Sequence, residues 1–301
     1  MVFNKLAVTA LPLACTLVGI QMAFAVVMML CAFPTLHFGS LWDVLRWSCV
    51  APFFTGMLLT SIVALEHAPM SMVVVFRVLS PFFSLVIERF LPNPHRISAL
   101  LVVSMGIMVA GAGVYSAGLP VDNLFSGLPW IIFNMLLAVA DRLVQRSMLA
   151  QDQAPVDISL SGVTLLNNLW GCMFMLIAAV VLGELQELPV LLKSLGSEHV
   201  IWILCSCFVG TCISFTGIFV QKRISATSFL VLINVNKFGI IFLEAFVMGT
   251  KTLSTSQIFG GSVAISGGVL YGQARKAIEE SAKGETQPLL DKSEKVEKSK
   301  W

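Results

Sequence analysis

A lysine lies in the middle of an apolar stretch that is long enough to cross a lipid bilayer. Lys237 occupies the centre of residues 227–249, in which Glu244 is the other charged residue. A helix rises about 1.5 Å per residue, so this stretch would span a hydrocarbon layer of about 30 Å and hold Lys237 near its midplane. An ammonium group is costly at that depth and is usually retained for function. The sequence therefore predicts that Lys237 binds an anion; the alternative is that it neutralises Glu244, which lies close to the same helix face.

Three more polar side chains fall at a similar depth in other apolar stretches. Arg77, Asn167 and Asn168 each lie about nine or ten residues into their stretch, near the middle of the hydrocarbon layer. Asn234 precedes the lysine by one helical turn and therefore shares its helix face. Polar groups at one depth predict a shared, wet cavity that lipid does not touch. The alternatives are structural: Arg77 pairs with a carboxylate such as Asp141, and the asparagines hydrogen-bond neighbouring helices.

The composition is that of a membrane protein. Hydrophobic residues make up 57% of the 301-residue chain, charged residues 12%, and the mean hydropathy is +0.88. A soluble domain of this length would expose far more charge, so that class is excluded. The apolar runs predict an all-α, polytopic membrane helix bundle with about nine transmembrane helices. The runs fall near residues 9–32, 46–66, 69–90, 97–117, 123–149, 157–183, 199–220, 226–248 and 254–274.

Lysine and arginine accumulate in one set of alternate loops, which predicts the orientation. The opposite loops carry Lys193 and Lys251, with Lys5 at the amino end. The richer set is predicted to be cytosolic together with the carboxyl end, and nine spans then place the amino end across the membrane. The richer set comprises Arg46, Arg89, Arg96, Arg142, Arg146, Lys222 and Arg223, with Arg275 and Lys276 in the tail. Of these, Arg142 and Arg146, with Asp141 and Gln145, are interpreted as a solvated helix end or a topology signal.

Two of the runs contain several glycines, which allow helix backbones to approach closely. Alternating access needs such contacts, and so does any tightly packed bundle. The glycines are Gly106, Gly111 and Gly113 in the run 97–117, and Gly260, Gly261, Gly267 and Gly268 in the run 254–274.

Short motifs are spread along nearly the whole chain. They are Phe76-Arg77-Val-Leu-Ser80, Leu166-Asn167-Asn168, Asn234-Val-Asn236-Lys237 and Gly267-Gly-Val-Leu-Tyr271. Together they resemble the nucleotide-sugar and triose-phosphate transporter family of the drug/metabolite transporter superfamily. The first is similar to the basic segment of the family's fourth helix and the last to its final helix. The second and third resemble the aromatic-Tyr-Asn-Asn and Gly-Ala-Leu-Asn-Lys motifs of GDP-mannose transporters.

The resemblance implies a particular organisation of the chain. Members of the family have ten helices in two inverted repeats of five, and residues 1–22 resemble the end of the first helix and the start of the second. The chain is therefore expected to lack the family's first helix. The transmembrane domain is expected to cover residues 1–277, with a first repeat at about 1–120 and a second at about 121–277. Residues 278–301 are rich in Glu, Lys and Ser and are predicted to form a disordered cytosolic tail.

The resemblance also implies a function and a division of labour in the site. A cytosolic nucleotide sugar would be exchanged for lumenal nucleoside monophosphate, with a GDP-sugar slightly favoured over a UDP-sugar. Asn167 and Asn168 would meet the base, and the segment from Asn234 to Lys237 would meet sugar and phosphate. Arg77 could add a planar fork of donors for phosphate, and Tyr271 is a further candidate for substrate binding, with an ordinary interfacial aromatic as its alternative.

Two other functions are compatible with the sequence. The protein could be an organic-phosphate carrier of the same fold, or a non-transporting, truncated membrane protein. The sequence also allows a homodimer. No catalytic residues, metal site, cofactor or nucleic-acid partner is expected, because the spans contain no histidine-carboxylate cluster, metal-ligand spacing or glycine-rich phosphate loop. The segment 285–290 resembles an acidic dileucine sorting signal. Residues 298–301 lack the lysine spacing of an endoplasmic-reticulum retrieval signal. A Golgi or endosomal address is therefore favoured, and the predicted location is the Golgi membrane before an endosomal or endoplasmic-reticulum membrane.

Overall fold

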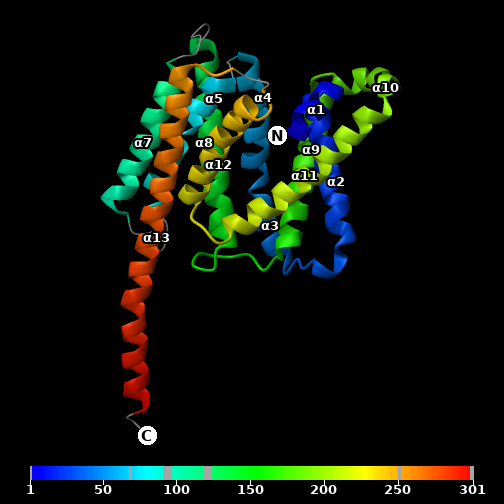
Figure 1. The fold of residues 1–301 in the computed structure, drawn as a ribbon. Helices are drawn as coiled ribbons and strands as arrows, with labels where there is room; N and C mark the ends of the chain where they lie inside the picture. Colours follow the sequence, from blue (N-terminus) through cyan, green and yellow to red (C-terminus); the bar gives the residue numbers. More distant parts are fainter. Residues whose placement is uncertain (1, 68–69, 91–96, 118–123, 250–251, 299–301) are drawn as a thin grey trace. The chain divides into compact units, whose positions relative to one another are not determined.

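The computed structural model describes residues 2–67, 70–90, 97–117, 124–249 and 252–298. Every regular element in these ranges is a helix, so the all-α class is confirmed. Figure 1 traces the helices along the chain. Their bounds are α1 Val2–Ala10, α2 Ala14–Cys31, the 3-10 helix η1 Phe33–Thr35, α3 Leu41–Ser48, α4 Ala51–His67, α5 Met70–Arg77, α6 Ser80–Glu88, α7 Ala99–Ser116, α8 Leu124–Leu149, α9 Leu160–Val181, α10 Glu184–Ser194, α11 Ser197–Gln221, α12 Ala226–Phe246 and α13 Thr255–Lys298.

Six of the described helices are long and apolar enough to cross a membrane. Large apolar side chains on them face outward: on α9, Leu176, Ile177 and Val180 are 45%, 52% and 61% exposed. Apolar surface of this extent suits lipid and not water. The protein is a polytopic membrane helix bundle, as the sequence predicts. The six segments are Ala14–Cys31, Ala99–Ser116, Gly127–Leu149, Leu160–Val181, Ser197–Gln221 and Ala226–Phe246.

The predicted span at residues 69–90 is not one helix. It divides into α5 and α6, and Pro81 is the second residue of α6. Proline has no N–H to donate to the carbonyl four residues earlier, which belongs to Arg77, and its ring crowds that carbonyl. The hydroxyl of Ser80 donates to the Arg77 carbonyl oxygen instead, at 2.6 Å. The prediction of a continuous helix is therefore wrong, and Arg77 is the last helical residue before the break.

The last helix is longer than the span predicted for it. α13 begins at Thr255 and its backbone stays helical to Lys298, well past residue 278, where a disordered tail is predicted. Figure 1 shows this part of α13 running on beyond α7. A charged helix of this composition gains little from burial and is marginal without neighbours, so the disorder of the tail in solution stays a prediction.

The helices form two compact units. The first comprises Met1–Ser84 and Val121–Leu230, and the second comprises Leu85–Pro120 and Val231–Trp301. These units are defined by the contacts between helices. The repeats implied by the family resemblance are instead two halves of the chain related by an inverted symmetry, and contacts do not test them. The repeats at about 1–120 and 121–277 stay a prediction.

In the first unit, α2 packs against α9 and α11, and α4 packs against α8. A carboxylate from α10 closes the amino end of α2. Glu184 accepts hydrogen bonds from the backbone N–H groups of Cys15 and Thr16 at 3.0 and 2.7 Å, and from the Thr16 hydroxyl at 2.8 Å. These N–H groups belong to the first turn of α2 and have no partner within the helix, and a negative charge is favourable at this end of the helix dipole.

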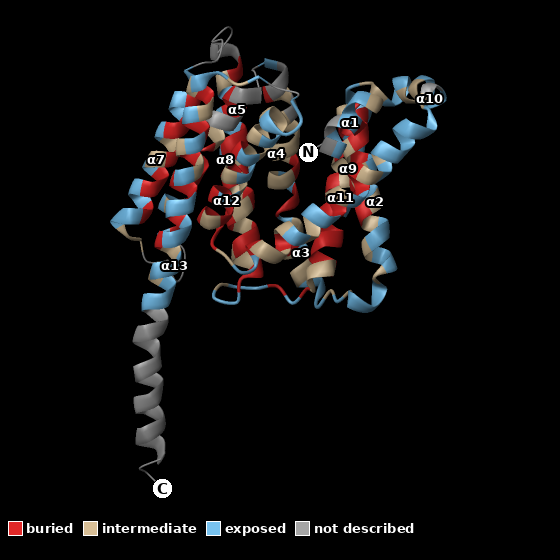
Figure 2. Ribbon diagram, viewed as in Figure 1, coloured by how far each residue is buried: buried red, intermediate tan, exposed pale blue. Residues whose placement is uncertain are grey.

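In the second unit, α7 packs against the part of α13 that contains Gly260 and Gly267. Both helices turn their buried residues toward each other and expose the opposite side (Figure 2). Three glycines make the close approach possible. A Cβ atom on Gly267 would lie 2.6 Å from the backbone N of Met108, and Cβ atoms on Gly111 and Gly260 would also meet backbone of the other helix. Gly106 and Gly113 face open space, so the glycines of one run have different roles.

We predict that Gly267→Ala lowers the free energy of unfolding by about 1–3 kcal/mol, because the new methyl group must push two backbones apart. Gly113→Ala is the matched control on α7, since a Cβ there meets nothing within 4 Å. Thermal unfolding of the purified protein in detergent measures both. Equal melting temperatures for the two variants would contradict the close packing.

Candidate functional site

The structure distributes the predicted site residues over both units. Arg77, Asn167 and Asn168 belong to the first unit, whereas Asn234, Lys237 and Tyr271 belong to the second. A cavity shared by all six stays a prediction.

Arg77 is held at the end of α5 by a polar network that reaches α4 and α8. Its Nε donates to Asn134 Oδ1 at 3.0 Å, and its Nη2 donates to the same oxygen and, at 3.1 Å, to Ser61 Oγ. Asn134 is fully buried, and its Nδ2 donates to the Thr60 hydroxyl at 2.9 Å and to the Met57 carbonyl at 2.6 Å. Arg77 is thereby fixed in orientation at the point where the helix breaks.

Asn134 is a residue of this network that the sequence reasoning missed. Its depth in the run 123–149 resembles that of the predicted site residues, but a single amide without a motif gave no reason to choose it. The pairing of Arg77 with Asp141, considered above, does not form. Asp141 instead forms an ion pair with Arg142, with 3.5 Å between Oδ2 and Nε.

Asn167 and Asn168 are neighbours on α9 with different surroundings. Asn168 is 5% exposed, and its Nδ2 donates to the Thr164 carbonyl at 2.8 Å and to Ser214 Oγ of α11 at 2.9 Å. This asparagine therefore connects two helices. Asn167 is 7% exposed, and within the described part of the chain its side chain has no hydrogen-bond partner. The polar atoms of its amide are not among the fully buried side-chain atoms that lack a partner, so water or a ligand can reach them.

The residues of the second unit are all at least partly enclosed. On α12, Asn234 is 2% exposed and Lys237 is half-buried one turn later. Tyr271 on α13 is 3% exposed, so its ring is enclosed by the protein. Each of the three already interacts with another group of the protein. Asn234 and Lys237 share one face of α12, as their spacing predicts.

A second polar cluster joins the ends of α8 and α11. Asp141 is fully buried, and its Oδ1 accepts from Gln145 Nε2 at 2.8 Å. Gln221 is also fully buried, and its Nε2 donates to the Arg142 carbonyl at 2.9 Å while its Oε1 accepts from Arg142 Nη1 at 3.2 Å. The interpretation of this region as a solvated helix end is therefore wrong. Arg142 also lies over the Phe229 ring, 5.1 Å from its centroid.

Taken together, the fold and these side chains define a multi-span membrane protein with buried polar groups inside its helices. No protein-family model matches the chain. The chain is similar to GDP-mannose transporter GONST2 of Arabidopsis thaliana, with 22% identity over 240 residues, which are 78% of this chain and 63% of that protein. It is also similar to GDP-fucose transporter 1 of Arabidopsis thaliana, with 25% identity over 219 residues, which are 70% of this chain and 62% of that protein.

The matched region thus spans less than two thirds of the length of either relative. A crystal structure of another protein is similar to this fold with a TM-score of 0.66. The similarity covers 92% of this chain and 98% of that chain at 14% sequence identity. At this identity the likeness shows the fold alone.

We predict that replacing the two asparagines by alanine has different effects on the stability of the protein. Asn168→Ala removes a hydrogen bond between α9 and α11 and should lower the free energy of unfolding by about 1–2 kcal/mol. Asn167→Ala removes an amide that has no protein partner and should leave the melting temperature of the ligand-free protein unchanged or raised. The two variants are each other's control because they delete the same group from adjacent positions. A larger loss for Asn167→Ala would show that it holds helices together.

Proposed function

We propose that the protein is a nucleotide-sugar antiporter that exchanges a cytosolic nucleotide sugar for lumenal nucleoside monophosphate by alternating access. The observation that carries this proposal is Asn167, a largely buried residue in the middle of an apolar helix, whose amide has no hydrogen-bond partner in the described protein and can be reached by water or a ligand. The edge of a nucleotide base presents the donors and acceptors that an amide requires, whereas a simple phosphate does not. The similarity to two transporters named for GDP-sugars supports this substrate class and favours GDP over UDP.

The remaining recognition is assigned to the cations and to the asparagine on α12. Lys237 supplies a compact charge with three donors for a phosphate oxygen, and Asn234 on the same face meets hydroxyl groups of the sugar. Arg77 stands at a helix break within an apolar span, and broken helices are where transporters of this kind form binding sites. Tyr271 and Asn168 are proposed to support the site by packing and hydrogen bonding.

The proposal includes an orientation and a location. The arginine-rich loops and the carboxyl end face the cytosol, although Arg96 and Lys251, which contribute to this assignment, lie outside the described residues. The Golgi membrane is the proposed location. Both curated relatives are named as transporters, so no enzymatic reaction is proposed.

Uptake into proteoliposomes tests the function directly. Vesicles containing the full chain are loaded with GMP, UMP, CMP or buffer alone and mixed with labelled GDP-, UDP- or CMP-sugars, or with labelled inorganic or triose phosphate. We expect uptake of GDP-sugars into GMP-loaded vesicles and little uptake into vesicles that contain only buffer. Uptake of inorganic or triose phosphate in preference to every nucleotide sugar would replace this proposal with the organic-phosphate carrier. No uptake of any substrate would favour the non-transporting membrane protein.

We predict that Lys237→Ala abolishes exchange while the protein still inserts and purifies. A charge within the hydrocarbon layer is tolerated with a counter-charge, which the bound phosphate supplies in each half of the cycle. Lys237→Arg should recover little exchange, because a planar fork does not replace a compact ammonium group. Initial rates of uptake measure both variants.

The double variant Lys237→Ala with Glu244→Ala is the control for charge balance. If the lysine only neutralised Glu244, removing both charges would restore transport to nearly the original rate. We expect the double variant to remain inactive. Recovery of exchange would make Lys237 a structural ion-pair residue and remove the proposed anion site.

A further inference from the structure

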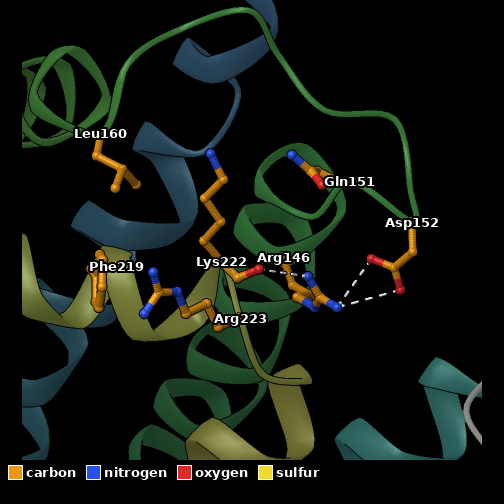
Figure 3. Close-up of a pocket in the computed structure, with 7 residues that line it drawn as sticks. All are labelled: Arg146, Gln151, Asp152, Leu160, Phe219, Lys222 and Arg223. Atoms are coloured by element: carbon orange, nitrogen blue, oxygen red, sulfur yellow. Dashed lines mark hydrogen bonds and ion pairs between the residues drawn. The ribbon is translucent and has the colours of Figure 1, made fainter. Parts of the chain in front are cut away.

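A basic pocket at the ends of α8 and α11 contains none of the residues assigned to the substrate. It has a volume of about 490 Å³ and lies within the first unit. Figure 3 shows Arg146 turned toward Asp152 and Arg223 turned toward Phe219, with Lys222 extending between them. The pocket is lined by Arg146, Gln151, Asp152, Leu160, Phe219, Lys222 and Arg223.

The charges around this pocket do not cancel. Three cationic side chains line it, and Asp152 is the one carboxylate in the lining. Asp152 is engaged by Arg146, whose Nη2 lies 3.1 Å from Oδ1. Arg146 Nη1 donates in addition to the Lys222 carbonyl at 3.2 Å. The pocket therefore keeps the charges of Lys222 and Arg223 in excess, which matches a phosphate group with two negative charges.

The donors of these two side chains are available to a ligand. The Arg223 guanidinium stacks on the Phe219 ring, 4.0 Å from its centroid. Stacking uses the face of the guanidinium and leaves its N–H groups directed outward in the plane. Lys222 is exposed and, in the described part of the chain, its ammonium group has no ion-pair or hydrogen-bond partner. Both can therefore donate charge-assisted hydrogen bonds to an anion without breaking an existing bond.

The helix ends around the pocket have opposite electrostatic effects on a bound anion. Leu160 is the first residue of α9, whose amino end is favourable for an anion, whereas α8 and α11 end at Leu149 and Gln221, where a cation is favoured. The alternative to anion binding is that the basic residues only offset the negative ends of the α8 and α11 helix dipoles. That role requires cations near the ends, but it does not require unused donors around a pocket, and it does not bind an added anion.

We propose that this pocket is a binding site for a phosphate group of at least two negative charges. Such a group occurs on free pyrophosphate or nucleotides and on the headgroup of a phosphorylated inositol lipid, and both sources present the same chemistry to Lys222 and Arg223. The site is independent of the proposed transport function, because it uses none of the residues assigned to the substrate.

Two measurements distinguish the sources. For the soluble source, pyrophosphate is titrated into the full chain in neutral detergent and its affinity is measured by calorimetry. All variants are made in the Lys237→Ala background, so that the proposed substrate site does not contribute. For the lipid source, the same proteins are placed in phosphatidylcholine nanodiscs with a few per cent phosphatidylinositol 4-phosphate, and retained lipid is counted by native mass spectrometry.

We expect the double change Lys222→Gln with Arg223→Gln to weaken binding by about tenfold or more in whichever arm shows binding, because two charge-assisted donors are lost. Asp152→Asn should strengthen binding several-fold, because it removes the opposing charge and releases Arg146. Lys276→Gln is the matched control. Lys276 is exposed, pairs with Glu280 at 3.7 Å and lies on α13, and its removal should leave binding unchanged.

Several outcomes would overturn the proposal. Absence of binding in both arms would do so, as would an affinity that the double change and Asp152→Asn leave unchanged. An equal loss in the Lys276→Gln control would reduce the effect to general attraction between charges. Melting temperatures in the absence of anion complete the test. If the double change lowers them while binding is unaltered, the basic residues only balance the helix ends.

Discussion

A backbone that leaves its helix inside a folded protein must find new partners for its N–H and C=O groups, and this constraint acts at the break between α5 and α6. Pro81 ends the hydrogen-bond ladder at the Arg77 carbonyl, and the Ser80 hydroxyl takes the place of the missing donor. The break ends α5 while leaving this carbonyl satisfied. It also fixes Arg77 where Asn134 and Ser61 can hold its guanidinium. Pro81, Ser80 and Arg77 thus act together, and the polar network of Asn134 and Ser61 is arranged around them.

The same constraint explains why buried polar residues in this protein are of two kinds. Asn168 bonds to α9 and α11 and uses both of its donor hydrogens on the protein. Asn167, one residue earlier, points its amide where no described group receives it. The first kind contributes to the stability of the bundle, and the second kind leaves its donors and acceptor unused by the described protein. Adjacent identical residues therefore differ in their contacts: Asn168 joins two helices, and Asn167 is the residue to which the proposed function assigns base recognition.

Some of this structure could be predicted from the sequence, because the signals were long or simple. The apolar runs and their length predict a helical membrane protein, and the spacing of Asn234 and Lys237 correctly places them on one helix face. The break at Pro81 was missed because apolar residues continue on both sides of it. Asn134 and Gln221 were missed because an isolated amide has no pattern, and its partners on other helices appear only when the chain is folded. Asp141 was expected in solvent, yet it is fully buried because Arg142 and Gln145 accompany it.

The carboxylate of Glu184 has a consequence for the order in which the protein matures. It seals the first turn of α2, although 168 residues separate it from Thr16. A ribosome adds about 5–20 residues per second, so α2 exists for roughly 10 to 30 seconds before Glu184 is made. During that interval the first-turn N–H groups of α2 must be satisfied by water or by the insertion machinery. The amino-terminal part of the bundle is therefore completed late in synthesis, when α10 arrives, although it is made first.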